Sequence, residues 1–326
     1  MRIVFHGEIA ASFSHDFQRL VGETAQISVL PDVLTDPVHA QTYVAADVVV
    51  SHAFSGVLPQ PRQLQLFHVP GAGYDAVDLD AIPDSAVVCN CFGHEQAIAE
   101  YVMAALLERH VPLADADRHL RQGHWTYAAG SSERVHGELA GKTIGLLGFG
   151  HIGKAIAARA KAFEMKVHAA NRSPVPTSSL VDRSFGLNRL GEFWSSADVF
   201  VVSVPANADT VGIVSAESFA AMRASAVILN VGRGPTIDER ALYEALRDRR
   251  IAGAVIDTWY SYPSPSHPSI LPSKFPFHEL GNVVMTPHMS GWTTGTINRR
   301  KQTIADNIGR RAAGRPCVNV VRPART

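Results

Sequence analysis

Three polar residues in the second half of the chain each stand just after an apolar run. Arg233 follows SAVILNVG, Asp257 follows IAGAVI, and His288 follows NVVMTP. If these runs are parallel strands of one open sheet, their carboxyl ends form a ligand crevice in which the three side chains can converge. Each has a structural alternative, because Asp often begins a turn, a single His is often structural and Arg often pairs with an acid. Three such residues at one edge of a sheet favour a shared catalytic or binding role over three separate structural ones.

A glycine-rich turn that suits a nucleotide lies upstream. The segment GFGHIG, residues 148–153, follows the strand-like KTIGLL and opens an amphipathic stretch. In this setting the first glycine permits a tight turn, the second lets the backbone approach a pyrophosphate, and the third lets helix and strand pack closely. A turn of this composition without a ligand is the alternative. The residues predicted to bind the cofactor here are Gly148, Gly150, His151, Ile152 and Gly153.

The end of the next strand-like run lacks the usual acid. Asn171, Arg172 and Ser173 stand where many dinucleotide folds place an Asp or Glu on the ribose hydroxyls. A neutral amide, a guanidinium and a hydroxyl instead offer donors to a 2′-phosphate. The sequence therefore predicts NADP as cofactor, with NAD also possible if Arg172 is only a solvated turn residue.

Helix-compatible and strand-like segments alternate along the whole chain. From Lys142 to His288 the runs are nearly continuous and β-branched, which indicates parallel strands covered on both faces. The first hundred residues read as a smaller α/β unit, residues 95–121 as one long connecting helix, and the ending RPCVNVVRP as a strand that returns to the first unit. We therefore expect an α/β protein with two Rossmann-like domains and doubly wound parallel sheets. The substrate domain, residues 1–94 and 290–326, is discontinuous, and residues 95–289 form the dinucleotide-binding domain.

Composition excludes several classes of partner. Thirty basic and thirty acidic residues give no global field for nucleic acid or a membrane surface. Three cysteines are too few for a disulfide framework, and Cys89-x-Cys91 has no second pair to complete a zinc site, so no metal is expected. The beginning of the chain lacks the long apolar stretch of a signal peptide. A cytoplasmic protein with no nucleic-acid or membrane partner is expected.

Several ordered segments resemble one enzyme family. They are GAGYDAVDLDAI, AIAEYVMAALL, ELAGKTIGLLGFGHIGKAIA, ILNVGRGPTIDERAL, AVIDTWYSYP and NVVMTPHMSGWT. From about Gly71 to Trp292 the chain is similar to the D-isomer-specific 2-hydroxyacid dehydrogenases, and it looks most like their NADP-preferring glyoxylate and hydroxypyruvate reductases.

The resemblance implies a role for each matching residue. Arg233 corresponds to the arginine that holds the substrate carboxylate, and the backbone amides of Ala72 and Gly73 to donors that grip the same group. His288 corresponds to the general acid and base, and Asp257 to the residue that positions the nicotinamide amide. The other residues implied to line the cofactor cleft are Val204, Pro205, Val231 and Gly232.

One position departs from the family pattern. The usual catalytic Glu, five residues after the strand-end Asp, is replaced by Tyr262. A neutral phenol can orient His288 but supplies no charge that favours the imidazolium. We therefore expect His288 to titrate lower than in relatives with the Glu, unless another acid such as Glu279 reaches it. Alternatively, Tyr262 faces the substrate and shapes its pocket.

The resemblance implies an oxidoreductase that reduces a small 2-oxo acid to the D-2-hydroxy acid, with glyoxylate or hydroxypyruvate as first trials. It also implies a homodimer formed through the nucleotide-binding domain. Two alternatives stay open. One is a nucleotide-sensing interaction protein of the same fold with weak or no turnover, and the other is a formate- or phosphite-type dehydrogenase.

Overall fold

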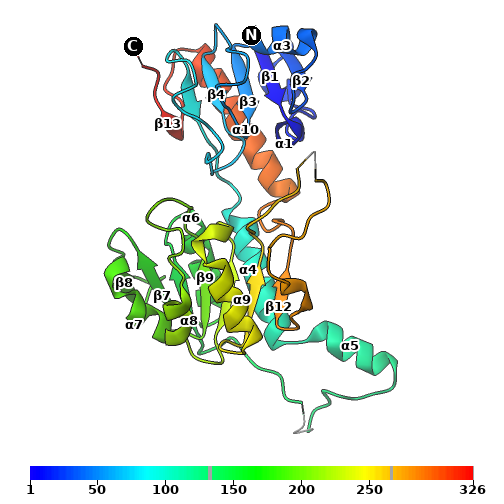
Figure 1. The fold of residues 1–326 in the computed structure, drawn as a ribbon, viewed down its shortest axis with the longest axis vertical. Helices are drawn as coiled ribbons and strands as arrows, with labels where there is room; N and C mark the ends of the chain where they lie inside the picture. Colours follow the sequence, from blue (N-terminus) through cyan, green and yellow to red (C-terminus); the bar gives the residue numbers. More distant parts are fainter. Residues whose placement is uncertain (131–133, 265–266, 326) are drawn as a thin grey trace. The chain divides into compact units, whose positions relative to one another are not determined.

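The computed structural model describes residues 1–130, 134–264 and 267–325 of the chain. It contains two compact units, one formed by Met1–Gly93 and Thr294–Thr326 and the other by His94–Thr293 (Figure 1). Each unit has its own largely parallel sheet, which confirms the predicted fold class and the discontinuous smaller domain. What each predicted domain binds stays a prediction. Residues 131–133 and 265–266 of the predicted dinucleotide-binding domain and residue 326 of the predicted substrate domain lie outside the described residues.

The first unit is built on a sheet whose described strands follow the order β13-β5-β4-β3-β1-β2. Strands β1 to β5 run parallel to their neighbours, and β13 pairs antiparallel with β5, so the end of the chain does return to this unit. The strands are β1 (Arg2–His6), β2 (Gln26–Leu30), β3 (Val48–Ser51), β4 (Leu66–His68), β5 (Val87–Cys89) and β13 (Val320–Arg322). The helices are α1 (Glu8–Ala11), α2 (Gln18–Val21), α3 (Pro37–Val44) and α10 (Thr294–Ala312).

Both faces of this sheet are buried because successive strand residues point to opposite sides. Val48 and Val50 of β3 pack in one apolar cluster with Ile304 of α10. Val49, between them, packs in the other cluster with Tyr43 of α3. The unbroken valine run of β3 is therefore explained by burial on both faces.

The second unit has a longer parallel sheet, with described strands in the order β12-β11-β10-β9-β6-β7-β8. The strands are β6 (Thr143–Leu147), β7 (Lys166–Asn171), β8 (Arg183–Gly186), β9 (Val199–Val202), β10 (Val227–Asn230), β11 (Gly253–Ile256) and β12 (Val283–Met285). The helices are α4 (Glu95–His110), α5 (Leu113–Arg121), α6 (His151–Ala162), α7 (Leu190–Ser195), α8 (Ala216–Ala221) and α9 (Glu239–Arg247), with short 3₁₀ turns at Leu187–Arg189, Gly234–Thr236 and Phe277–Glu279.

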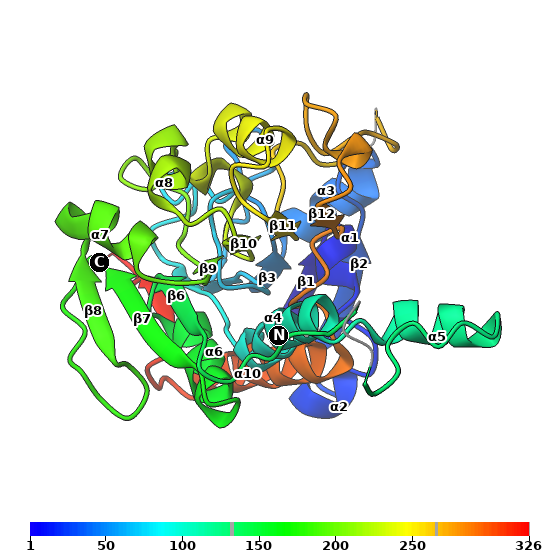
Figure 2. The same ribbon diagram turned by 90° about the horizontal axis from the view of Figure 1, so that it is seen from below.

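Helices cover both faces of this second sheet, with α4 and α6 on one side and α8 and α9 on the other (Figures 1 and 2). Val201 of β9 packs with Val102 of α4, whereas the preceding Phe200 packs with Phe193 of α7 and Leu242 of α9. The sheet is therefore doubly wound, as predicted. In such a sheet a ligand can bind in the crevice outside the carboxyl ends of the strands.

The prediction of a single helix over residues 95–121 is wrong. Helix α4 ends at His110, Val111 leaves the helical region with φ −123° and ψ 89°, and α5 begins at Leu113. The cause is Pro112, which has no N–H to donate and disfavours the helical conformation of the residue before it. None of the described helices combines the length and apolar character needed to cross a membrane.

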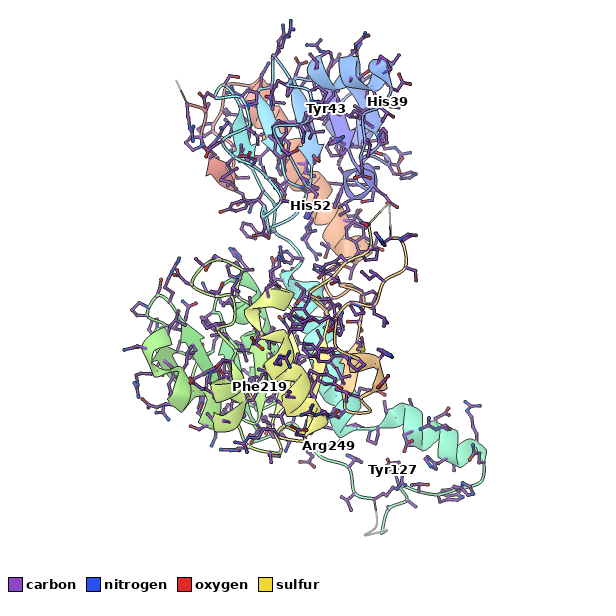
Figure 3. All side chains as sticks on the ribbon, viewed as in Figure 1. His39, Tyr43, His52, Tyr127, Phe219 and Arg249 are labelled. Carbon is purple, nitrogen blue, oxygen red and sulfur yellow. The ribbon has the colours of Figure 1, made fainter. Side chains whose placement is uncertain are left out.

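Residues 112–130, called the arm, contain α5 and the segment after it. No described residue of α5 is buried, and Leu113 and Trp125 are 70% and 73% exposed. Tyr127 lies on the segment after α5 (Figure 3), and its hydroxyl donates to Asp115 at 2.9 Å. The arm is thus ordered by polar contacts within itself while its large apolar side chains stay exposed.

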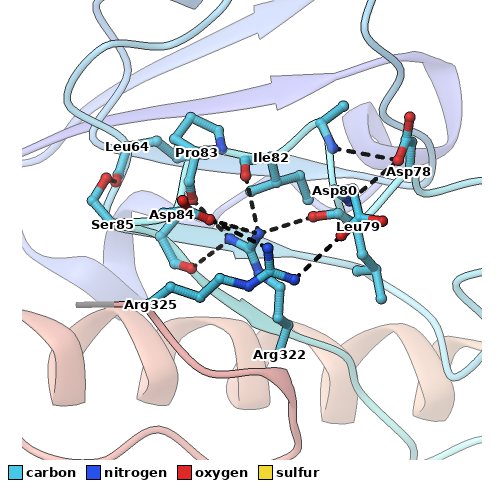
Figure 4. Close-up of polar contacts among 12 residues, drawn as sticks. Leu64, Asp78, Leu79, Asp80, Ile82, Pro83, Asp84, Ser85, Arg322 and Arg325 are labelled. Carbon is cyan, nitrogen blue, oxygen red and sulfur yellow. Dashed lines mark hydrogen bonds and ion pairs between the residues drawn. The ribbon is translucent and has the colours of Figure 1, made fainter.

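A buried arginine ties the end of the chain to the first unit. The guanidinium of Arg322 donates to the carbonyl oxygens of Leu79, Ile82, Pro83 and Ala86 at 2.7–3.0 Å (Figure 4). A buried charge is tolerated only when such partners replace its water. The clamp therefore fixes the loop before β5 and the strand β13 that pairs with β5.

A second contact joins β4 to α10 through His68, which is fully buried. Its Nδ1 lies 3.1 Å from the carbonyl oxygen of Val69, and its Nε2 lies 3.1 Å from the amide nitrogen of Asn307. The ring therefore carries its proton on Nδ1 and accepts at Nε2. Burial lowers the pKa of His68 to about 4.

Acid should weaken the first unit through this histidine. The unfolded chain takes up the proton near pH 6.5 and the folded chain only near pH 4, so the stabilisation is complete above pH 6.5 and lost as the pH falls to 4. The difference corresponds to about 3 kcal/mol. We expect His68→Gln, which keeps an acceptor for Asn307, to lose less unfolding free energy over this range in urea denaturation. Parallel pH curves for the two proteins would contradict this.

Candidate active site

The predicted site residues of the second unit lie at the carboxyl edge of its sheet. Gly148 follows β6, Arg233 lies just after β10, Asp257 follows β11, and His288 lies just after β12. Because these strands are parallel and β6, β9, β10, β11 and β12 are successive neighbours, their carboxyl ends line one edge. The structure therefore brings these residues to the same edge, as the sequence indicated.

The loop after β6 and the start of α6 contain three glycines in different surroundings, and their binding of a pyrophosphate stays a prediction. Gly148 adopts φ +98°, which favours glycine, and its N–H donates to the carbonyl of Ala170 at 2.9 Å. A Cβ on Gly153 would overlap the carbonyl oxygen of Gly148, so helix and loop can pack only without one. A Cβ on Gly150 would meet no protein atom within 4 Å. Space is thus left beside the amino end of α6, where N–H groups favour an anion.

The ends of β9 and β10 lie against this loop. A Cβ on Gly232 would come within 2.7 Å of the carbonyl oxygen of Val204, and one on Gly148 would come within 3.0 Å of Cγ1 of Val204. Val231 is buried and Pro205 is exposed. The residues predicted to line the cofactor cleft are therefore adjacent, and Gly232 is required by the close approach of two backbones.

The end of β7 places its polar residues in different surroundings. The side chain of Asn171 accepts from the N–H of Phe149 at 3.3 Å and donates to the carbonyl of Ser173 at 3.0 Å. It therefore braces the glycine loop and its own turn. Arg172 and Ser173 are exposed beside it. Of the predicted 2′-phosphate ligands, Arg172 and Ser173 are the ones whose side chains face solvent.

Arg233 lies in an extended segment that is fixed by hydrogen bonds to its neighbours. Its carbonyl accepts from the hydroxyl of Thr236 at 2.6 Å and from the amide of Asn230 at 3.1 Å, and its Nη1 donates to the carbonyl of Gly232 at 3.0 Å. The next residue is Gly234, where a Cβ would overlap the carbonyl of Trp259. Arg233 is thereby fixed beside the β11 end of the sheet, half-buried.

Asp257 is fully buried and organises the loop that carries the histidine. Its Oδ1 accepts from the hydroxyl of Thr286 at 2.6 Å and from the N–H of Met289 at 2.8 Å, and its Oδ2 accepts from the N–H of Ser290 at 3.0 Å. These donors flank His288 on both sides. The carboxylate thus holds the loop, and its predicted contact with the nicotinamide amide stays a prediction.

His288 adopts φ +59°, a left-handed conformation that costs free energy for a residue with a Cβ. Its ring is exposed, and its Nδ1 lies 3.0 Å from the hydroxyl oxygen of Tyr262. The same oxygen accepts from the N–H of Trp259 at 3.0 Å. The structure therefore places Tyr262 on the histidine, and of the two roles considered for it, support of His288 is the one that this contact favours.

Tyr262 stays a neutral phenol at physiological pH. Burial raises its pKa above the ordinary value of 10.0, although the N–H of Trp259 and the nearby charge of Arg233 oppose that shift. A phenol oxygen can accept from Nδ1–H of an imidazolium or donate to Nδ1 of a neutral ring. The bond orients His288 in both protonation states without supplying a negative charge.

Sequence reasoning missed two residues that hold this loop. The indole N–H of Trp259 donates to the carbonyl of Thr286 at 2.8 Å, and Thr286 bonds Asp257 through its hydroxyl. Each stands two positions from a predicted site residue, and this closeness in sequence was the signal that could have identified them. Ala72 and Gly73, predicted to grip the substrate, lie in the first unit, where the amide of Asn90 donates to the carbonyl of Ala72 at 2.7 Å.

A doubly wound sheet with a glycine-rich loop before a helix is typical of dinucleotide-binding domains. Residues 103–290 match the family described as D-isomer specific 2-hydroxyacid dehydrogenase, NAD binding domain. The chain belongs to this family, and its cofactor is NAD or NADP. The predicted family resemblance is therefore confirmed.

Three proteins illustrate the similarity. The D-3-phosphoglycerate dehydrogenase of Archaeoglobus fulgidus is 30% identical over 289 residues, which cover 87% of this chain. The matched region spans 50% of the length of that relative. An NADPH-dependent glyoxylate/hydroxypyruvate reductase of Sinorhizobium meliloti, solved with NADP and malonate, is 28% identical with a TM-score of 0.75 and covers 98% of this chain and 96% of its own. An acyclic imino acid reductase solved with NADPH and D-arginine is 25% identical with a TM-score of 0.79 and covers 99% and 100%.

The glycine loop allows cofactor binding and folding to be separated. We expect Gly150→Ala to weaken NADPH binding about tenfold or more, because the methyl group fills space left for the pyrophosphate, while the melting temperature of the free protein barely changes. Gly153→Ala should instead lower that temperature, because its methyl group meets the Gly148 carbonyl. Fluorescence titration with NADPH and thermal unfolding measure the two effects.

The control for this pair is Gly191→Ala, where a Cβ also meets no atom within 4 Å but lies on α7, away from the loop. It should change neither property beyond a small gain in helix stability. Undiminished NADPH affinity in Gly150→Ala would show that the open space beside α6 is not the pyrophosphate site.

A carboxylate in place of Tyr262 should raise the pKa of His288. An opposite charge this close favours the imidazolium, by about 1 pH unit or more. We expect the histidine resonance that disappears in His288→Gln to titrate higher in Tyr262→Glu than in the parent protein when followed by NMR. Any 2-oxo acid reduction should then persist to higher pH in the variant, because that reaction consumes the proton.

The companion variant is Tyr262→Phe, which removes the bond to Nδ1 and adds no charge. It should leave the midpoint close to that of the parent protein while the ring loses its fixed orientation. Superimposable titrations and pH–rate profiles for the parent protein and Tyr262→Glu would refute the electrostatic argument.

Proposed function

We propose that this protein reduces a small 2-oxo acid to the D-2-hydroxy acid with NADP(H). The observation that carries the proposal is the pair formed by His288 and Tyr262, with Nδ1 and the phenol oxygen 3.0 Å apart, at the same sheet edge as the arginine and the glycine loop. The membership of the chain in the 2-hydroxyacid dehydrogenase family supports it.

In this proposal the protein's own groups bind the acid and move one proton. The guanidinium of Arg233 binds the substrate carboxylate and polarises the adjacent carbonyl. The cofactor, when bound, supplies a hydride to the carbonyl carbon. His288 gives the proton on Nε2 to the carbonyl oxygen, and the bond between Nδ1 and Tyr262 keeps the ring in place during the transfer. One 2-oxo acid, one NADPH and one proton thus become one hydroxy acid and one NADP⁺.

NADP is proposed over NAD because no acid follows β7. Arg172 and Ser173 are exposed at its end and offer charged and hydroxyl donors to a 2′-phosphate, while Asn171 braces the loop. Two of the similar solved structures contain NADP or NADPH, which agrees with this preference.

Glyoxylate and hydroxypyruvate are the proposed first substrates, by similarity to the Sinorhizobium meliloti reductase. The amides of Ala72 and Gly73 are proposed as further donors to the substrate carboxylate. Malonate in that related structure shows that a relative of this fold accommodates a small carboxylic acid.

A second candidate is reduction of a 2-imino acid to a D-amino acid. An iminium carries its own proton and positive charge, so it needs no imidazolium beside it, and a neutral Tyr262 suits such a substrate better than a site that favours a second cation. The similarity to an acyclic imino acid reductase supports testing it.

We also propose a homodimer located in the cytoplasm. The arm exposes Leu113 and Trp125, and Val135, further along the sequence, is 79% exposed. Large exposed apolar side chains can be covered by a partner, and a second copy of the chain is the proposed one.

The function is tested by steady-state assays with 2-oxo acids of increasing size, with either cofactor, and with and without ammonium. We expect glyoxylate or hydroxypyruvate to be reduced with a higher kcat/KM for NADPH than for NADH, and the product to be the D-hydroxy acid. Formation of a D-amino acid only with ammonium would favour the second candidate. Oxidation of formate or phosphite with NADP, or no turnover of any compound, would reject both.

The cofactor preference has a matched pair of variants. Arg172→Asp should cut kcat/KM for NADPH about 10- to 100-fold and affect NADH less, because it replaces a charge-assisted donor to the 2′-phosphate with a repelling charge. Arg249→Asp makes the same change of charge at another exposed position of this unit and should leave the NADPH/NADH ratio unchanged. A parent protein that prefers NADH would overturn the NADP assignment.

A further inference from the structure

A tyrosine on the first helix of the second unit reaches the loop that carries His288. Tyr101 lies on α4, and its hydroxyl oxygen is 2.7 Å from the hydroxyl oxygen of Thr286. The two residues are 185 positions apart in the sequence. Tyr101 belongs to the partly buried apolar side chains packed on the cluster that α4 shares with α6, so the contact starts from a fixed helix.

The direction of this bond follows from the next one. Thr286 donates its hydroxyl proton to Oδ1 of Asp257 at 2.6 Å. A hydroxyl has a single proton, so Thr286 accepts in the contact with Tyr101, and Tyr101 donates. Burial raises the pKa of Tyr101, which keeps that donor protonated. Two successive hydrogen bonds thus run in one direction, from Tyr101 to Thr286 and from Thr286 to the buried carboxylate of Asp257.

Thr286 is also held at both of its backbone groups. Its N–H donates to the carbonyl of Ile256 at 3.0 Å, and its carbonyl accepts from the indole of Trp259 at 2.8 Å. The two hydrogen bonds of its hydroxyl group then fix the orientation of the side chain. Thr286 stands two positions before His288, whose left-handed backbone must be imposed by its surroundings.

We infer that Tyr101 and Thr286 are positioning residues for His288, and that they act in series through Asp257. The inference rests on the proposed function, because it assumes that His288 transfers a proton to the substrate. Neither residue touches the substrate in this account. Their bonds set the loop from Thr286 to Ser290 so that the imidazole keeps the placement that proton transfer needs.

The series arrangement predicts how substitutions combine. Tyr101→Phe removes one hydrogen bond and should lower kcat about fivefold. Thr286→Val removes the donor to Asp257 and the acceptor for Tyr101, and a histidine displaced by a fraction of an ångström should lower kcat by up to about 100-fold. KM for NADPH should change much less than kcat, because the glycine loop is not part of this series of hydrogen bonds. The double variant should be no slower than Thr286→Val alone, and Thr286→Ser should restore most of the rate.

The matched control is Tyr260→Phe. Tyr260 is another largely buried tyrosine of this unit, and its hydroxyl donates to the carbonyl of Ile237 at 3.1 Å, outside the loop. Its removal should lower the melting temperature to a similar degree as Tyr101→Phe and leave kcat unchanged. Equal losses of kcat in both variants would show a general structural effect and overturn the inference. So would additive losses from Tyr101→Phe and Thr286→Val.

A measurement that needs no turnover separates this inference from the proposed function. The NMR resonance of the His288 ring should shift in Tyr101→Phe and Thr286→Val, and it should stay in place in Thr286→Ser, which keeps the hydroxyl, and in Tyr260→Phe. If the parent protein reduces no 2-oxo acid, the proposed function fails while this readout still decides whether Tyr101 positions the ring. An unchanged His288 resonance in Tyr101→Phe would reject the positioning role even in an active enzyme.

Discussion

The carboxylate of Asp257 is the constraint on which the arrangement of the site depends. It is withdrawn from water, so it must find its hydrogen bonds within the protein, and it finds them in the loop after β12. Those bonds are stronger than neutral ones because the acceptor is charged. They offset the cost of the left-handed backbone at His288. An exposed histidine can therefore keep a fixed place on a loop with no regular structure, because the group that holds it is buried directly beneath.

Close backbone approaches provide the second constraint. At Gly153, Gly232 and Gly234 a Cβ would overlap or crowd a neighbouring carbonyl oxygen, so strand ends can draw together there only without side chains. At Gly150 the reason is different, since the space beside it is empty of protein. Glycines that look alike in sequence thus differ in their surroundings, because some are required by the packing of the edge and Gly150 borders open space.

Features that depend on local pattern could be predicted from the sequence. The parallel strands, the glycine loop and the placement of Arg233, Asp257 and His288 at strand ends follow from runs of apolar residues and the residue that ends each run. The importance of Tyr262 was visible because it departs from a familiar motif, and its contact with His288 agrees with one of the two roles considered.

What could not be predicted depends on partners distant in sequence or on competition for one side chain. Asn171 could be placed at the end of its strand, but its bonds to Phe149 and Ser173 are set by the fold of the loop. Tyr101 gave no signal, because a tyrosine on an amphipathic helix is typical of a core residue and its partner is far along the chain. Pro112 indicates the break between α4 and α5, but the helical pattern on both sides of it favoured the prediction of a single helix.

The split of the first unit has a consequence for the order in which the protein is made. A ribosome delivers β1 to β5 first, then the whole second unit, and only afterwards α10 and β13. Before α10 and β13 are synthesised, one face of the first sheet lacks the packing of Ile304 and Ile308. Strand β5 also has an unpaired edge. The loop before β5 lacks its hydrogen bonds to Arg322. The first unit therefore finishes folding later than the second, although it begins the chain. The second unit is synthesised in one continuous stretch and can fold before the first is complete.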